Sequence, residues 1–167
     1  MESMYIESPQ NKHVKNLVKL RDRKHRNRQD KFIIEGLREI EHAIDADYPL
    51  NTLYYSTELC PSESHSIPIE RLQTNSRLQL IRMHASAFSK SSYREGPDGL
   101  MALSEAKEMN LSTLELKEDS TLLILEGIEK PGNLGAIIRS AEGAGVDAIL
   151  LNNCLFSGDT LLINGTG

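Results

Sequence analysis

Apolar residues near the start of the chain recur at the three- and four-residue spacing of a helix. Val14, Leu17 and Val18 follow this spacing between polar and basic residues. Such a stripe is typical of an amphipathic helix that packs one face on a core. We predict a single helix that begins at Asn11 and ends near Arg28.

Short apolar runs then alternate with helical stretches as far as residue 106. This alternation is typical of an α/β body. The predicted elements are a strand at 31–35, a helix at 37–44, a strand at 50–56, a helix at 67–75, a strand at 78–83, a helix at 84–90 and a strand at 99–103.

The stretch at 105–120 is acidic and polar with scattered leucines, and it predicts a linker. The continuous apolar run at 121–125 that follows is typical of a strand buried on both faces. A loop, a helix at 133–144 and a second apolar strand at 146–151 complete a βαβ unit, whose strands are expected to run parallel. The apolar content after this unit is too low to predict the further elements of a buried parallel sheet.

Composition narrows the class of protein. The chain has 167 residues, of which 39% are hydrophobic and 26% are charged, so we expect a folded core. No run of about 18 apolar residues occurs, and the first residues are acidic and polar, so neither a membrane span nor a secretory signal is predicted. Cys60 and Cys154 lie far apart without paired histidines, which indicates neither a zinc site nor a disulfide framework. We expect a cytoplasmic protein without a bound metal ion.

The basic residues are concentrated in one segment. Residues 12–31 contain nine Lys and Arg against two acidic residues, a local net charge of +7, whereas the rest of the chain has ten basic and 22 acidic residues, a net charge of −12. Lys and Arg placed against phosphates release counterions, so this segment indicates a contact with a polyanion such as RNA or DNA. The alternative is a solvated helix whose charges keep the protein soluble.

The most specific local pattern lies at 126–139, where a predicted strand leads through a loop into a helix. Open α/β sheets place ligands at such loops, and the N–H groups of a helix start attract anions. Gly132 and Gly135 allow a ligand to approach the backbone. Arg139 lies four residues after Gly135, within reach of a phosphate or a ribose. A dinucleotide site is not favoured, because no G-x-G-x-x-G is present.

The pattern Asn133-x-Gly135-x-x-x-Arg139 resembles the first signature motif of the SpoU-type (TrmH-like) RNA ribose 2′-O-methyltransferases of the SPOUT superfamily. Upstream segments resemble the substrate-binding domain of this family, which folds like ribosomal protein L30e. These segments are Ser8-x-x-Asn11-x-x-Val14-Lys15, residues 32–40 and Pro97-x-Gly99-Leu100-x-Ala102.

The resemblance implies an α/β fold in which an L30e-like α/β/α N-terminal domain is followed by the first βαβ unit of an α/β-knot (SPOUT) methylase domain. We accordingly expect a basic N-terminal helix at 1–30, an RNA substrate-binding domain at 31–106, a linker at 107–120 and an incomplete methyltransferase domain at 121–167. The family builds its S-adenosylmethionine pocket from later motifs. The resemblance therefore implies a truncated chain that is inactive alone and has no cofactor-binding residue of its own. It implies a homodimer for the full-length family member only.

The resemblance also implies roles for single residues. Arg139 acts on the ribose 2′-hydroxyl of an rRNA or a tRNA, and Asn133 supports the substrate and the arginine. A guanidinium keeps its proton up to about pH 12, so stabilisation of the developing alkoxide suits it better than proton abstraction. Glu126 orients the loop or is solvated. Burial of Arg139 in an apolar interior would contradict this interpretation.

Contact with RNA is predicted for basic residues of the first helix and for two arginines farther along the chain. A non-catalytic L30e-like RNA-binding module is the alternative function. A nucleotide- or phosphate-binding α/β protein is a third hypothesis, which leaves the basic segment unexplained. The predicted RNA-binding residues are Lys15, Lys19, Arg21, Arg23, Lys24, Arg26, Arg38 and Arg94.

Overall fold

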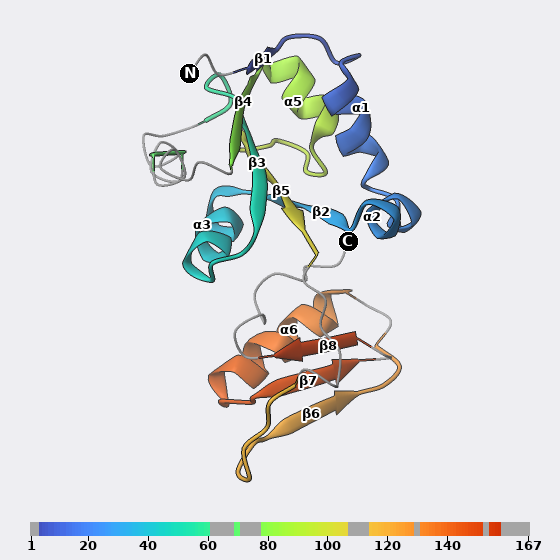
Figure 1. Cartoon of the computed structure of the whole chain (residues 1–167), viewed down its shortest axis with the longest axis vertical. Helices are drawn as coiled ribbons and strands as arrows, with labels where there is room; N and C mark the ends of the chain where they lie inside the picture. Colours follow the sequence, from blue (N-terminus) through green and yellow to red (C-terminus); the bar gives the residue numbers. More distant parts are fainter. Residues whose placement is uncertain are drawn as a thin grey trace. The chain divides into compact units, whose positions relative to one another are not determined.

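The structure of the chain, a computed structural model, describes residues 4–60, 69–70, 78–106, 114–128, 131–151 and 154–157. The chain divides into two compact units, residues 1–106 and residues 107–167 (Figure 1). The basic segment is therefore part of the first unit.

A mixed sheet of five strands forms the centre of the first unit. These strands are β1 (Met4–Ile6), β2 (Lys31–Glu35), β3 (Leu50–Tyr55), β4 (Gln79–Met83) and β5 (Leu100–Glu105). They lie in the order β1-β4-β3-β5-β2. Strands β1, β4 and β3 are parallel, whereas β5 is antiparallel to both β3 and β2.

Helices cover both faces of this sheet. They are α1 (Lys12–Lys19), α2 (Arg23–Gln29), α3 (Leu37–Asp45) and α5 (Ala85–Ser91). Figure 1 shows α1 and α5 on one side of the sheet and α3 on the other side, and α3 contacts β2 and β5. The described part of the first unit is thus a three-layer α/β/α body.

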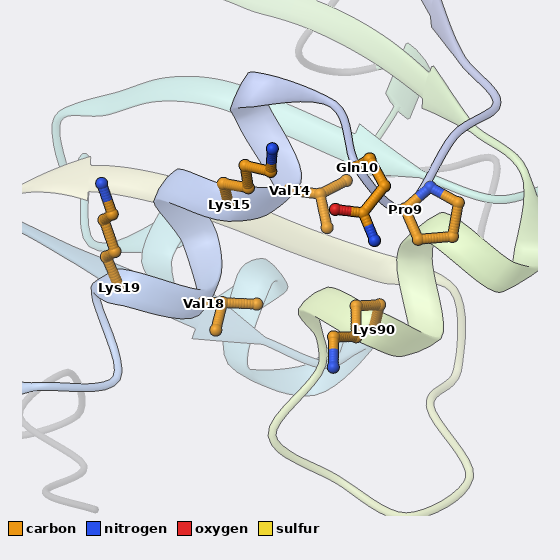
Figure 2. A pocket seen from close by; sticks show the side chains of 7 residues that line it. All are labelled: Pro9, Gln10, Val14, Lys15, Val18, Lys19 and Lys90. Carbon is orange, nitrogen blue, oxygen red and sulfur yellow. The ribbon is translucent and has the colours of Figure 1, made fainter.

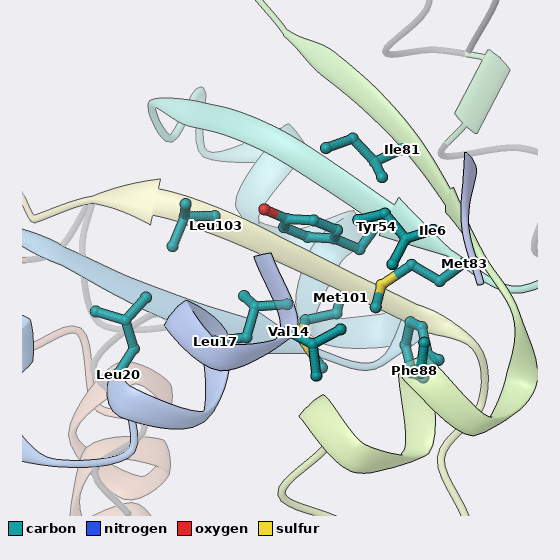
Figure 3. Packing of buried hydrophobic residues seen from close by; sticks show 11 residues of the cluster. Ile6, Val14, Leu17, Leu20, Tyr54, Ile81, Met83, Phe88, Met101 and Leu103 are labelled. Carbon is teal, nitrogen blue, oxygen red and sulfur yellow. The ribbon is translucent and has the colours of Figure 1, made fainter. Parts of the chain in front are cut away.

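A hydrophobic core fills the space between the sheet and the pair α1 and α5 (Figure 3). Leu17 of α1, Phe88 of α5 and Met101 of β5 all have an exposed fraction of 0%. Side chains alternate along a strand, so Leu100 and Ala102, which are also buried, belong to the face toward α3. The sheet is therefore buried on both faces.

The helix predicted near the start of the chain is wrong in one respect, because the structure has two helices there. Leu20 is buried where α1 ends, and the Asp22 side chain accepts a hydrogen bond from the N–H of Lys24 at 2.8 Å, which caps the start of α2. Arg26 of α2 donates hydrogen bonds to the carbonyl oxygens of Leu20 at 3.1 Å and Arg21 at 2.6 Å. Carbonyl groups that the end of α1 leaves unpaired thus find partners on α2.

The other elements predicted for the first unit are confirmed to within two residues where the structure describes them. The predicted helix at 67–75 lies outside the described residues, except for 69–70. Strand β1 was not predicted, since only Ile6 of its three residues is buried and a run this short has no readable period.

The second unit contains a three-stranded sheet and one helix among its described residues. Strands β6 (Leu122–Leu125), β7 (Ala148–Leu151) and β8 (Cys154–Ser157) lie in that order, and α6 (Pro131–Gly143) connects β6 to β7. Strands β6 and β7 are parallel, which confirms the predicted βαβ unit. Strand β8 pairs antiparallel with β7 and was not predicted.

Strand β6 corrects the prediction of a strand buried on both faces. Leu123 and Leu125 pack against a cluster that includes Leu134 and Ile138 of α6. Ile124, which points to the opposite face, is 73% exposed. Helix α6 therefore covers one face of this sheet. The described fold leaves the other face, which carries Ile124, open to solvent.

Within the described residues, no helix has the length and apolar character that a membrane crossing needs.

Candidate functional site

The loop after β6 and the start of α6 hold the residues predicted to handle a ribose. Glu126 directly follows β6 and is exposed, and Asn133 is exposed in the first turn of α6. Gly127 has a φ of +69°, a backbone conformation that favours glycine. Around Gly132, no atom other than those of its chain neighbours and of the backbone of its own helix lies within 4 Å of the position that a Cβ would occupy. Glu126, Gly132 and Asn133 are therefore accessible to a ligand.

Arg139 lies on α6 and is exposed rather than buried in an apolar interior. Its guanidinium lies over Gly135, with Nη1 3.6 Å from the position that a Cβ would occupy at that glycine. Long helical side chains commonly point toward the start of their helix. The guanidinium is thus directed toward the end of α6 where Asn133 lies.

Several of the predicted RNA-binding cations are exposed and, within the part of the chain that the structure describes, make no contact that would hold their charged groups. Among the described residues, their side chains have no hydrogen-bond or ion-pair partner, so they can all turn to a phosphate. These cations are Lys15 and Lys19 on α1, Arg23 and Lys24 on α2, and Arg38 on α3.

Arg21 and Arg26 have structural partners, which the sequence did not indicate. Arg21 donates hydrogen bonds to the carbonyl oxygens of Lys90, at 2.9 Å, and Ser92. Its guanidinium also lies 5.3 Å from the centroid of the Tyr93 ring. Since Arg26 bridges the end of α1, both arginines fix the backbone around the basic segment, and their contact with RNA stays a prediction.

Arg94 is half-exposed and forms a 2.8 Å ion pair with Glu39 on α3. Gly36, just before α3, has a φ of +113°, and a Cβ there would lie 2.7 Å from Nη1 of Arg94. Glycine is therefore required for this close approach. The ion pair leaves less of the positive charge of Arg94 available to RNA than the sequence suggested.

Tyr93 and Lys90 were missed by the sequence analysis. Tyr93 is 47% exposed beside two arginines, in a setting where aromatic rings stack on unpaired bases. Burial of part of the ring raises the pKa of the Tyr93 phenol, although Arg26 and Arg21 oppose this shift. Lys90 lies far from the basic segment in sequence and faces α1 in space (Figure 2). To find them, one must know that α5 packs beside α1, and sequence periodicity does not give this pairing.

The described residues do not by themselves fit a bound S-adenosylmethionine. A nucleoside and an amino acid need buried polar groups that the fold leaves without partners. Among the described residues, the buried side-chain atoms without a partner are Asn51 Oδ1 and Ser56 Oγ, both in the first unit. In the same described ranges, no cluster of three or more His, Cys, Asp or Glu could hold a metal ion.

Comparison with known proteins assigns the family. The domain family described as "MRM3-like substrate binding domain" matches residues 11–102, more than half of the chain. The chain belongs to the SPOUT family of RNA 2′-O-methyltransferases. This finding confirms the resemblance that the sequence motifs indicated.

Two relatives extend the match through both units. The chain is 31% identical over 159 residues to the 23S rRNA (guanosine(2553)-2′-O)-methyltransferase RlmP of Bacillus subtilis (strain 168), covering 93% of this chain and 58% of that protein. A crystal structure of an RNA 2′-O ribose methyltransferase matches with a TM-score of 0.73 and 33% identity, covering 95% of this chain and 59% of that one.

A third match includes the methyl donor. The AdoMet-bound rRNA methyltransferase from Sinorhizobium meliloti matches with a TM-score of 0.75 and 25% identity, covering 90% of this chain and 55% of that one. The fold is thus a mixed α/β fold like that of SpoU methyltransferases. The chain spans between 55% and 59% of the length of these three proteins. Because the matches include the second unit, they support an RNA methyltransferase by family rather than the non-catalytic module.

Proposed function

We propose that the chain provides the RNA-binding domain and the ribose-binding start of the methylase domain of an S-adenosylmethionine-dependent ribosomal RNA 2′-O-methyltransferase. The observation that carries the proposal is the match of a substrate-binding family to residues 11–102, the unit that holds the +7 segment. In this proposal the first unit is L30e-like and the second unit begins an α/β-knot domain. The names of the relatives favour ribosomal RNA over transfer RNA as the substrate.

The first unit binds the RNA mainly through phosphates. The exposed cations on α1 and α2 have the freedom to contact a backbone, and each contact releases a counterion. Phosphate contacts position a protein without specifying a sequence. The target nucleotide is therefore selected by other features of the unit.

The second unit presents the acceptor side of the reaction. Arg139 donates hydrogen bonds to the ribose 2′-oxygen and stabilises the negative charge that develops there, while Asn133 holds the ribose and its phosphate. Removal of one such donor typically lowers a rate by about 10²–10³-fold. Glu126 is exposed beside the turn at Gly127, and Gly132 and Gly135 leave room for the nucleotide.

Binding of RNA is tested by fluorescence anisotropy with a labelled ribosomal RNA hairpin over a range of salt concentrations. Replacement of Arg23, Lys24 and Arg28 with alanine should lower the slope of log K against log salt by about 2–3, since each phosphate contact contributes about 0.7–0.9. Arg26 is left intact because it holds α1 and α2 together. An unchanged slope would show that α2 is only a solvated surface.

Methyl transfer is tested by deletion of the gene that encodes this sequence, followed by mass-spectrometric mapping of ribose methylation in ribosomal and transfer RNA. One 2′-O-methylated nucleotide of ribosomal RNA should disappear, and a gene carrying Arg139→Ala should not restore it, whereas the parent gene should. Unchanged methylation would contradict the enzymatic proposal and favour a non-catalytic RNA-binding module.

The methyl donor is expected to bind a polypeptide of these 167 residues with a Kd weaker than about 1 mM. The reason is that the described residues leave no buried polar group of the second unit unpaired. Titration calorimetry with S-adenosylmethionine measures this affinity directly. A micromolar Kd would show that this length of chain already forms the cofactor site.

A further inference from the structure

A groove runs between α1 and α5 on the surface of the first unit (Figure 2). Its volume is about 270 Å³, close to the lower end of the range of ligand pockets, about 300 Å³. Seven residues line it: Pro9, Gln10, Val14, Lys15, Val18, Lys19 and Lys90. A hollow of this size suits one nucleobase rather than a duplex or a folded partner.

The floor and the rim of the groove differ in chemistry. Pro9, Val14 and Val18 give an apolar floor between the two helices. Figure 2 shows Lys15 and Lys19 extending from α1, and Lys90 extending from α5 on the opposite side. The lysine stems line the hollow while their ammonium groups reach solvent.

The lining contains three lysines and no acidic residue. Lys15 and Lys19 are four residues apart on one helix, an arrangement that is destabilising for like charges. Among the described residues, none of the three ammonium groups has an ion-pair or hydrogen-bond partner. Such an unneutralised set of cations is complementary to a chain of phosphates.

We propose that this groove holds an unpaired nucleotide of the substrate RNA, with its base on the apolar floor and the flanking phosphates on Lys15, Lys19 and Lys90. The inference rests on the proposed function, since it takes the bound polyanion to be RNA. Proteins read RNA mainly at loops and bulges, where unstacked bases can leave the helix and enter a pocket. The exposed amide of Gln10 at the groove offers a donor and an acceptor to the edge of the base.

Lys90 allows binding in this groove to be distinguished from general electrostatic attraction of RNA by the basic segment. It lies 59 residues after Lys31, the last cation of that segment, and joins Lys15 and Lys19 only through the packing of α5 on α1. Its carbonyl oxygen is held by Arg21 at 2.9 Å, so the position of the residue is fixed. A contribution of Lys90 to RNA affinity would therefore indicate an RNA strand in the groove.

The experiment compares binding of the full chain to two RNA hairpins, one with a single bulged 2-aminopurine and one fully paired, by anisotropy and by 2-aminopurine fluorescence. We expect tighter binding to the bulged RNA and a change in fluorescence as the probe enters the groove. Lys90→Ala should lower the salt slope for the bulged RNA by about 0.7. Lys117→Ala, an exposed lysine of the second unit, is the control of equal charge loss and should leave the slope as it is.

Val18→Gln tests the floor without a change in charge. It should remove the preference for the bulged hairpin and the fluorescence change, while the salt slope and the circular dichroism spectrum stay as in the parent chain. If Lys90→Ala and Val18→Gln both behave like Lys117→Ala, or if polyglutamate displaces the bulged RNA at equal charge concentration, the groove does not hold a nucleotide. Failure of the parent chain to bind either hairpin would instead contradict the proposed function itself.

Discussion

Both units alternate strands and helices, but they differ in how completely their sheets are buried. The sheet of the first unit has helices on both faces, and Phe88, Leu17 and Met101 are fully buried. The sheet of the second unit has α6 on one face, and Ile124 on the other face is 73% exposed. Hydrophobic burial drives folding, so the first unit gains more stability from its core than the described part of the second unit, which leaves apolar surface exposed.

The largest expected effect comes from opening the core of the first unit. Phe88→Ala removes a fully buried ring between α5 and the sheet, and changes of this kind cost about 3–5 kcal/mol. Urea unfolding followed by circular dichroism should show this loss in the free energy of unfolding.

Ile124→Ala is the matched truncation in the second unit. Because this side chain is mostly exposed, its removal should change the free energy of unfolding by no more than about 0.5 kcal/mol. Equal losses for the two variants would mean that Ile124 is covered in solution.

Hydrophobic periodicity predicted the helices and strands whose packing follows from the local sequence pattern. The strands and helices of the first unit have apolar runs bounded by turn residues, and the βαβ unit was predicted for the same reason. The break between α1 and α2 was not predicted, because it depends on the side chains of Asp22 and Arg26 satisfying backbone groups. The exposure of Ile124 was not predicted either, since an apolar run does not say what covers each of its faces.

The candidate sites divide in the same way. Arg139 and Asn133 could be named from a motif, because residues that share a short loop and helix lie close together whatever the rest of the fold does. The groove could not be predicted, since Lys90 and Lys15 line it together only after α5 packs beside α1 on one face of the sheet. The structural partners of Arg21 and Arg94 are likewise tertiary contacts.

A smaller effect is expected from glycines with positive φ in the two units. At Gly99, with a φ of +82°, a Cβ would lie 2.7 Å from the carbonyl oxygen of Ser56, whereas at Gly127, with a φ of +69°, it would meet nothing within 4 Å. Gly99→Ala should therefore cost about 2–3 kcal/mol from strain and displaced backbone. Gly127→Ala should cost about 1 kcal/mol from strain alone.

Amide hydrogen exchange can assign each loss to its unit. Exchange should become faster in β5 for Gly99→Ala and in β6 for Gly127→Ala. A larger loss for Gly127→Ala would mean that Gly127 is more tightly packed than Gly99, contrary to the distances given above.

The smallest expected effect is a pH dependence confined to the first unit. His13 is half-buried on α1, and its Nδ1 lies 3.2 Å from the hydroxyl of Tyr54. Burial, and then the charge of Lys12, lower the pKa of His13 below its ordinary value of 6.5. Burial also raises the pKa of Tyr54 to about 12, so its hydroxyl stays protonated and the histidine is the group that titrates.

Because the unfolded chain binds the proton more readily than the folded chain, stability rises with pH across this transition. The contribution of neutral His13 is complete above pH 6.5 and is lost as the pH falls from 6.5 through the lower pKa of the folded state. His13→Gln keeps a neutral polar side chain and removes the titration. In urea unfolding between pH 7 and pH 5, the parent chain should lose more stability than this variant. Equal pH dependence would show that the site is open enough for His13 to be protonated without cost, and that the edge of this core is less closed than its centre.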